Sequence, residues 1–185
     1  MPSQQAQPTT LRTQHTARRL RVLSYNVGGV TAELYDLLCR WIGQQQEADI
    51  VLLQEIHHGL GREESTWSIP GWSFVVAPDA RNRHSGVAAI ISHRVAYPDS
   101  ISFCSWAPGR VLQIRCEGTK ASIDVFCVYQ WVRNAAYPEQ REVQRTQVWN
   151  ALSRALNAVP ARNLLVVGGD FNAALLPWSC WRWGS

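Results

Sequence analysis

Two carboxylates and two carboxamides stand at the ends of three apolar segments, and these residue types suit a divalent metal and a phosphate. The four residues are Asn26, Glu55, Asp170 and Asn172. Polar residues at the carboxyl ends of buried strands converge in one crevice, where open α/β sheets bind ligands. Mg²⁺ prefers oxygen ligands and usually takes one or two carboxylates, completing its shell with water and substrate phosphate. The spacing therefore predicts a metal and phosphate site.

Each of these residues also has an ordinary structural interpretation. A carboxylate at a strand end is commonly solvated or paired with an arginine, and the Gly168-Gly169 pair can simply end a strand or give a ligand room to approach. His57, His58 and His84 are candidate general bases or metal ligands. Without a partner at ligand spacing, His57 and His58 are interpreted as surface loop residues. The combination of four polar residues at three strand ends favours a functional site.

Other catalytic classes have no motif in the chain. The sequence contains no phosphate-binding P-loop, no GxSxG run and no signature of a serine or cysteine triad. Nucleotide-driven and acyl-transfer chemistry therefore have no support.

A strand–helix–strand opening must position the first two polar residues. Residues 20–27 are predicted to form a strand that Gly28-Gly29 ends, and residues 49–55 form a continuous apolar run typical of a strand buried on both faces. Thr31 is a plausible N-cap for the helix between them. Its predicted buried stripe comprises Leu34, Leu37, Leu38, Trp41 and Ile42. This order of elements predicts an α/β layered fold.

The middle of the chain is dominated by strands, and a helix and a last strand follow it. The predicted middle strands are residues 72–76, 86–92, 111–115 and 122–129. Pro138 suits the first turn of the helix, and Pro160 stops it. Its predicted stripe comprises Val148, Leu152, Ala155 and Val159. Residues 163–167 are a second fully apolar strand, which leads into Asp170.

Composition narrows the class of protein. A chain of 185 residues is one domain by length, and 46% hydrophobic residues indicate a globular protein. No apolar run approaches the roughly 20 residues that span a bilayer, so no membrane partner is predicted, and nothing implies an obligate protein partner. Five cysteines without paired spacing exclude a zinc site or disulfide framework and favour an intracellular protein.

The charge permits a polyanionic partner. The net charge is +4, and all but one of the 18 basic residues are arginines, whose guanidinium groups bind phosphate in a bidentate manner. A simple compositional bias toward arginine explains the same numbers. Residues 1–19 lack acidic residues and are interpreted as a disordered leader, with an organelle-targeting segment as the alternative.

Five motifs occur in an order that resembles the endonuclease/exonuclease/phosphatase superfamily, which includes DNase I-like nucleases. They are Leu-Ser-Tyr-Asn26-Val, Leu-Leu-Gln-Glu55, His-Ser85-Gly86-Val87-Ala, Val-Tyr129 and Gly-Gly-Asp170-Phe-Asn172. The resemblance covers residues 20–176 and implies a four-layer α/β sandwich, in which two mixed sheets lie face to face with helices outside. The Trp-rich residues 177–185 do not fit it and are interpreted as an aberrant tail.

The resemblance also implies site roles. Glu55 would bind Mg²⁺, with Mn²⁺ as an alternative ion, and Asn26 would organise the metal and phosphate. Tyr129 would contact the phosphate, Asp170 would align or activate the attacking water, and Asn172 would hold the phosphate. The expected reaction is metal-dependent phosphodiester hydrolysis with DNA as substrate.

Three departures from the family pattern qualify that expectation. Gly28 stands where some members have Asp, and Gln130-Trp131 replaces a proline-containing turn. No counterpart of the family's C-terminal Asp-His motif precedes Ser185, so a fold truncated at the C-terminus, with an unpaired sheet edge, is expected. The sequence thus indicates a hydrolase family without assigning activity to these 185 residues.

Among the subfamilies, the apurinic-type endonucleases of non-LTR retrotransposons fit best. The reasons are the arginine-rich composition, the nine tryptophans, a compact domain after a leader and an apparently broken reading frame. A nuclear location follows for such an endonuclease. Two alternatives remain open: an inactive remnant that binds nucleic acid, and a phosphatase or phosphodiesterase of the same superfamily that acts on small or lipid phosphates.

Overall fold

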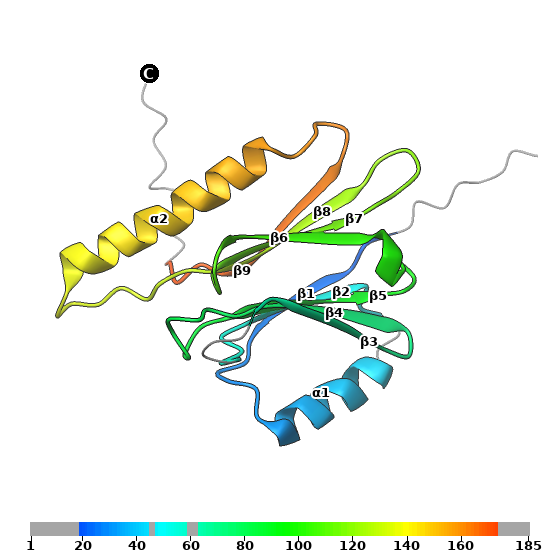
Figure 1. The fold of residues 1–185 in the computed structure, drawn as a ribbon, viewed down its shortest axis with the longest axis horizontal. Coiled ribbons are helices and arrows are strands. Elements are labelled where there is room, and N and C mark those ends of the chain that lie inside the picture. Colours follow the sequence, from blue (N-terminus) through cyan, green and yellow to red (C-terminus); the bar gives the residue numbers. More distant parts are fainter. Residues whose placement is uncertain (1–18, 45–46, 59–62, 174–185) are drawn as a thin grey trace, which may run out of the picture.

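The computed structural model describes residues 19–44, 47–58 and 63–173. Within them, two β-sheets lie face to face, and one long helix covers the outer side of each (Figure 1). This arrangement confirms the predicted four-layer α/β sandwich. The expected tail 177–185 and nearly all of the expected leader 1–19 lie outside the described residues.

The first sheet has five described strands in the order β1-β2-β5-β4-β3. Its strands are β1 (Val22–Asn26), β2 (Ile50–Gln54), β3 (Ser65–Ile69), β4 (Trp72–Ala77) and β5 (Val87–Ser92). Only β1 and β2 pair in parallel, and the other pairs are antiparallel. The parallel pair brings the carboxyl ends of β1 and β2 to one edge of the sheet, next to Asn26 and Glu55.

The second sheet has four described strands in the order β6-β7-β8-β9. Its strands are β6 (Ile101–Ala107), β7 (Val111–Cys116), β8 (Ile123–Tyr129) and β9 (Leu164–Asp170), and a single 3₁₀ turn, η1 (Pro98–Ser100), leads into β6. Here β8 and β9 form the parallel pair. Both sheets are therefore mixed, and each ends in a parallel pair.

The two described helices begin where the sequence predicts. In α1 (Ala32–Gln44), the Thr31 Oγ1 accepts a hydrogen bond of 3.2 Å from the Leu34 N–H, as an N-cap does. In α2 (Pro138–Asn157), the proline occupies the first turn. The predicted stripe of α1 is partly wrong, because Leu37 is 58% exposed and Tyr35 packs against the sheet instead.

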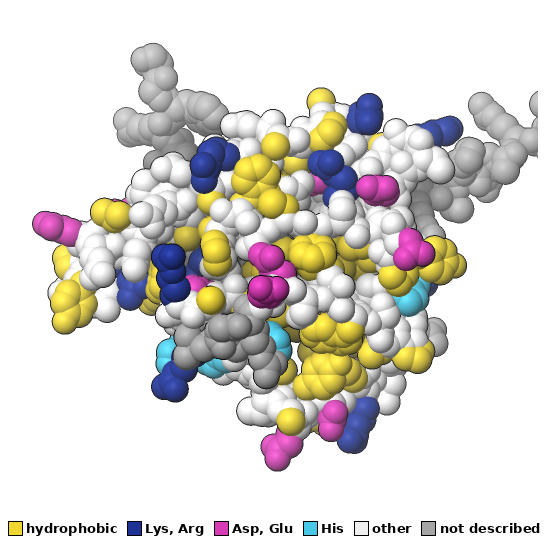
Figure 2. All heavy atoms as spheres, viewed as in Figure 1, with side chains coloured by type: hydrophobic (Ala, Val, Ile, Leu, Met, Phe, Trp, Pro, Cys, Tyr) yellow, Lys and Arg dark blue, Asp and Glu magenta, His cyan; other side chains and the backbone are white. Residues whose placement is uncertain are grey.

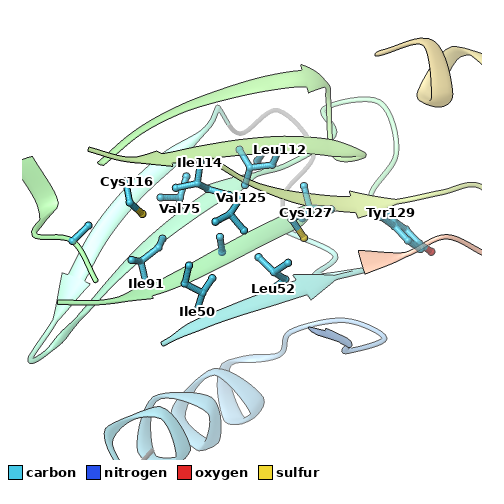
Figure 3. Close-up of a cluster of buried hydrophobic side chains, with 14 residues drawn as sticks. Ile50, Leu52, Val75, Ile91, Leu112, Ile114, Cys116, Val125, Cys127 and Tyr129 are labelled. Carbon is cyan, nitrogen blue, oxygen red and sulfur yellow. The ribbon is translucent and has the colours of Figure 1, made fainter. Parts of the chain in front are cut away.

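Three apolar layers hold the four structural layers together. Side chains of both sheets meet in the central layer, which includes Leu52, Leu112 and Cys127 and has Tyr129 at one end (Figure 3). The second layer lies between α1 and the first sheet, and the third lies between the second sheet and α2. Burial on this scale stabilises the fold at about 25 cal/mol per Å² of apolar surface.

The last strand is less buried than its apolar sequence suggests. β2 is buried along its whole length, as predicted, but Leu164, Leu165 and Val167 of β9 are between 39% and 51% exposed. β9 is the edge of the second described sheet, and it contacts β1, the edge of the first. The expected unpaired sheet edge stays a prediction, because residues 174–185, which follow β9, lie outside the described residues. None of the described helices is long and apolar enough to cross a membrane.

Candidate active site

One side-chain nitrogen joins the three strand ends. The Asn26 Nδ2 donates hydrogen bonds of 2.9 Å both to the Glu55 Oε2 and to the Asp170 Oδ2. The Asn26 Oδ1 accepts a hydrogen bond of 3.1 Å from the Gly28 N–H, which fixes the orientation of the amide. Asn26 therefore brings a carboxylate from each sheet to the same point, as the strand-end argument predicts.

The segment around Glu55 is held by backbone hydrogen bonds on both sides. The Glu55 carbonyl accepts a bond of 2.7 Å from the Gly29 N–H, and the His57 N–H donates one of 3.1 Å to the Ser85 carbonyl. Gly29 is required here, since a Cβ would lie 2.6 Å from the His57 Nδ1. The loop after β2 is thereby pinned between the loops after β1 and before β5.

Hydrogen bonds stabilise the ionised form of Glu55. Burial would raise the pKa of Glu55, but hydrogen bonds from Asn26, Tyr129 and His57 outweigh it and lower the pKa below its usual value. The His57 Nε2 lies 3.3 Å from the Glu55 Oε1, and its ring meets His84 edge-on. His57 is thus a half-buried partner of Glu55 rather than the free surface residue that its sequence context suggests.

Backbone strain gathers at this site. Among the described residues, the only non-glycine positions with positive φ are Glu55 (58°), His57 (52°) and Asn172 (44°). Such conformations cost on the order of 1–3 kcal/mol each and persist only where the surroundings enforce them. Glu55 bonds to the Asn26 amide, and His57 and Asn172 bond to Glu55 and Asp170, the two carboxylates that this amide joins. Clustering of this kind is typical of functional sites.

Asp170 and Asn172 are fixed by the end of β8 and by α2. The Asp170 Oδ1 accepts a hydrogen bond of 3.0 Å from the Asn172 N–H, and the Asn172 Nδ2 donates one of 2.8 Å to the Gln130 carbonyl. The buried Arg145 of α2 donates to the Trp131 and Asn172 carbonyls. One amide hydrogen of Asn172 is therefore used inside the protein, and none of the described residues accepts the other.

Tyr129 lies between Glu55 and a buried arginine. Its hydroxyl hydrogen-bonds to Glu55, and burial together with the charge of Glu55 raises the pKa of Tyr129. The Arg110 guanidinium stacks 4.4 Å from the centroid of the Tyr129 ring and 3.6 Å from that of Trp131. This stack sets the position of the Tyr129 ring beside the carboxylates.

The donor set fits a hard cation that needs few protein ligands. No group of three or more His, Cys, Asp and Glu side chains gathers anywhere in the described residues. Glu55 and Asp170 are instead two carboxylates that contact one Asn26 nitrogen, and Mg²⁺ is usually held by one or two carboxylates. Asn26 directs its nitrogen, not its oxygen, toward them.

The five residues singled out in the sequence come together, and others join them without a sequence signal. Asn26, Glu55, Tyr129, Asp170 and Asn172 form one hydrogen-bonded cluster. Arg110, Gln130 and Arg145 position members of the cluster. The sequence did not single out Arg110 or Arg145, and it marked Gln130 only as a departure from the family pattern. Only the burial of a polar side chain identifies them, and burial follows from the tertiary fold.

The two glycines before Asp170 serve packing. A Cβ on Gly169 would lie 1.9 Å from the Val128 carbonyl oxygen, and one on Gly168 would lie 2.9 Å from the Leu52 Cδ1. Gly169 also has a φ of 145°. They let β9 approach its neighbours closely, so ligand access is not needed to explain them.

The sequence profile of the Endonuclease/Exonuclease/phosphatase family matches residues 23–185. The chain belongs to this family. No curated protein sequence matches the chain significantly. The family assignment agrees with the observed fold, in which two mixed sheets carry outer helices.

Solved structures with the same fold include several enzymes that process DNA. The AP endonuclease LMAP from Leishmania major is 18% identical with a TM-score of 0.56, and the match covers 82% of this chain and 54% of LMAP. The 3′ phosphatase NExo from Neisseria, bound to a product DNA hairpin, is 19% identical with a TM-score of 0.56, and the match covers 83% of this chain and 58% of NExo. The endonuclease domain of TRAS1, a telomere-specific non-LTR retrotransposon, is 15% identical with a TM-score of 0.52, and the match covers 84% of this chain and 61% of that domain. The chain thus spans between half and two thirds of the length of these structures.

Proposed function

We propose that the chain carries the metal-dependent phosphodiesterase site of a DNA endonuclease of the retrotransposon type. The observation that supports this most is the Asn26 amide, which bonds carboxylates from both sheets at once. Carboxylates that only needed solvation would not require a shared donor and three strained residues at or bonded to them. The cluster has the geometry of a preorganised site.

Each residue of the cluster has a role that follows from its surroundings. Glu55 stays ionised because its hydrogen bonds lower its pKa, so it is a ready cation ligand. Asp170 has one oxygen bonded to Asn26 and the other to the Asn172 N–H, which aims its carboxylate at an attacking water. When bound, Mg²⁺ supplies Lewis-acid stabilisation of the charge on the phosphate.

Neutral donors complete the phosphate site. Tyr129 holds its phenol beside Glu55, and its raised pKa keeps the phenol protonated. Its single hydroxyl hydrogen is directed to Glu55, so it would reach a phosphate oxygen only by leaving that bond. The second amide hydrogen of Asn172 is available for a phosphate oxygen. Donors fixed before the substrate arrives stabilise developing charge without reorganisation.

The similar solved structures support DNA as the substrate. The similar structures include a 3′ phosphatase with a product DNA hairpin, a retrotransposon endonuclease domain and D. rerio TDP2 with a single-strand DNA product. The phosphatase among them makes a phosphomonoester at a DNA 3′ end the second candidate substrate.

Plasmid nicking tests this proposal. Wild-type protein with Mg²⁺ should convert supercoiled plasmid to the open circle, and EDTA should abolish the conversion. Glu55→Gln and Asp170→Asn should each lower the rate by at least about 100-fold. Glu33→Gln, which removes a carboxylate from the exposed first turn of α1, is the matched control and should nick normally.

The outcomes separate the candidates. Nicking that survives both substitutions contradicts the proposal, because a contaminating nuclease would then explain it. Release of phosphate from a 3′-phosphorylated hairpin, without nicking, would support the phosphomonoester alternative. DNA binding without either reaction would support an inactive nucleic-acid-binding remnant.

A further inference from the structure

A large cleft lies beside the carboxylate cluster and is separate from it. Its volume is about 740 Å³, within the range of ligand pockets. Four parts of the fold form its walls: the loop that follows β4, the end of β6 with the turn to β7, Trp131 in the segment after β8, and one face of α2. On the face shown in Figure 2, the basic side chains are dispersed and do not form one patch.

A buried arginine lines this cleft with part of its guanidinium unbonded. Arg110 is only 5% exposed, its Nη1 donates a bond of 3.5 Å to the Tyr129 carbonyl, and its Nε has no hydrogen-bond partner among the described residues. The negative charge of Asp79 also acts on the guanidinium, but from beyond ion-pair distance. Its guanidinium lies on the Trp131 and Tyr129 rings. A buried charge is costly unless it is paired. Because the Nε is unbonded and Asp79 lies beyond ion-pair distance, the guanidinium can still bind an anion in the cleft.

The remaining polar walls suit both halves of a nucleotide. Arg81 and Arg154 add two more guanidinium groups, whose donors match phosphate oxygens. Gln144 and Gln147 add carboxamides on α2, and carboxamides form paired hydrogen bonds with base edges. The carboxylate in the lining, Asp79, already accepts hydrogen bonds from the Ser85 hydroxyl and from the backbone N–H of Arg81.

We propose that this cleft binds a nucleotide of the substrate strand adjacent to the scissile phosphate. Arg110 and Arg154 contact the phosphate, and Gln144 and Gln147 contact the base. The inference rests on the proposed function, and its link to that site is direct, because the Arg110 guanidinium that lines the cleft stacks on Tyr129. An acidic peptide would satisfy the arginines but would leave the carboxamides without a role.

Binding in EDTA tests the cleft without requiring catalysis. The probe is a fluorescein-labelled single-stranded DNA 12-mer, followed by fluorescence anisotropy with the full 185-residue chain. The double variant Gln147→Ala/Arg154→Ala removes one carboxamide and one guanidinium from α2. The matched control, Arg40→Ala/Gln44→Ala, removes the same two groups from exposed positions of α1 on the opposite outer layer.

The expected result is an affinity about tenfold weaker for the cleft variant and unchanged for the control. The slope of log affinity against log salt should become shallower by about 0.7 for the lost phosphate contact. A 12-mer carrying 5-iododeoxyuridine should crosslink on irradiation to peptides that contain Trp106 or Trp131, the two indoles in the cleft wall.

Several outcomes would overturn the inference. Equal effects of the two double variants, or none, would show that the cleft does not bind the strand. Polyglutamate that displaces the 12-mer as well as unlabelled 12-mer does would favour an acidic peptide. Cleft-dependent DNA binding by a chain that nicks no plasmid would uphold the cleft and refute the proposed function, so the two failures are distinguishable.

Discussion

Removing the Asn26 amide should destabilise the protein in a pH-dependent way. In Asn26→Ala, the Glu55 and Asp170 carboxylates each lose a donor at 2.9 Å. A hydrogen bond to a charged group is worth about 1.5–3 kcal/mol. Asn26 is exposed, so water replaces much of this, and we expect a total loss of about 1.5 kcal/mol at pH 7.5, or about 3–6 °C in Tm.

The sign of the pH dependence follows from Glu55. Its folded pKa is lower than the unfolded value near 4.5, since the hydrogen bond from Asn26 is the strongest of those that offset burial. A lowered pKa contributes stability above the unfolded pKa, and the contribution is lost as pH falls through the folded pKa. The deficit of Asn26→Ala should therefore be full at pH 7.5 and should shrink at pH 3.5.

Urea unfolding in EDTA at both pH values measures this deficit. Ser24→Ala is the control. Ser24 lies two residues before Asn26 on β1, and its hydroxyl donates to the side chain of Gln54, which is neutral. Its small deficit should not depend on pH. A deficit of Asn26→Ala that is equal at pH 7.5 and 3.5, or smaller than about 0.3 kcal/mol at pH 7.5, would refute the assigned role of the amide.

Three further predictions concern the scaffold. Asp124→Asn should cost about 3 kcal/mol in urea unfolding, because this fully buried carboxylate accepts three side-chain hydrogen bonds, one of them from an arginine; a cost under 1 kcal/mol would contradict it. Gly169→Ala should destabilise by at least about 2 kcal/mol in the same assay, whereas Gly43→Ala, an open helical position, should stabilise by about 0.5–1 kcal/mol; equal effects would refute the packing argument. Burial raises the pKa of Cys127 to about 12, so iodoacetamide at pH 8 should label the exposed Cys104 in the native protein and spare Cys127, as peptide mass mapping would show.

Much of the fold follows from local pattern, and the failures have physical causes. The spacing of apolar residues, the N-cap Thr31 and the two prolines predict where α1 and α2 lie, because these signals act within a few residues. β3 (Ser65–Ile69) and β6 (Ile101–Ala107) were missed, since both have polar residues facing solvent and no continuous apolar run. β9 was predicted correctly as a strand and wrongly as buried, because an apolar run does not reveal whether its strand is central or at an edge.

The residues of the candidate site likewise fall into those that the sequence could predict and those that it could not. Asn26, Glu55 and Asp170 could be predicted because they end apolar strands, and parallel pairing brings strand ends together. Arg110 and Arg145 could not, because an arginine within a turn or a helix has no local feature that distinguishes a buried guanidinium from a solvated one. Their burial depends on contacts between elements that are distant in the sequence.

Metal binding tests the central claim most directly, because it requires neither substrate nor turnover. Mn²⁺ substitutes for Mg²⁺ at oxygen-ligand sites, and its free form can be counted by electron paramagnetic resonance as protein is added. The wild-type chain should bind one Mn²⁺ ion, Glu55→Gln should weaken binding by at least about tenfold, and Glu33→Gln should leave it unchanged. Equal affinities in all three proteins would contradict a metal-dependent centre at the ends of β1, β2 and β9.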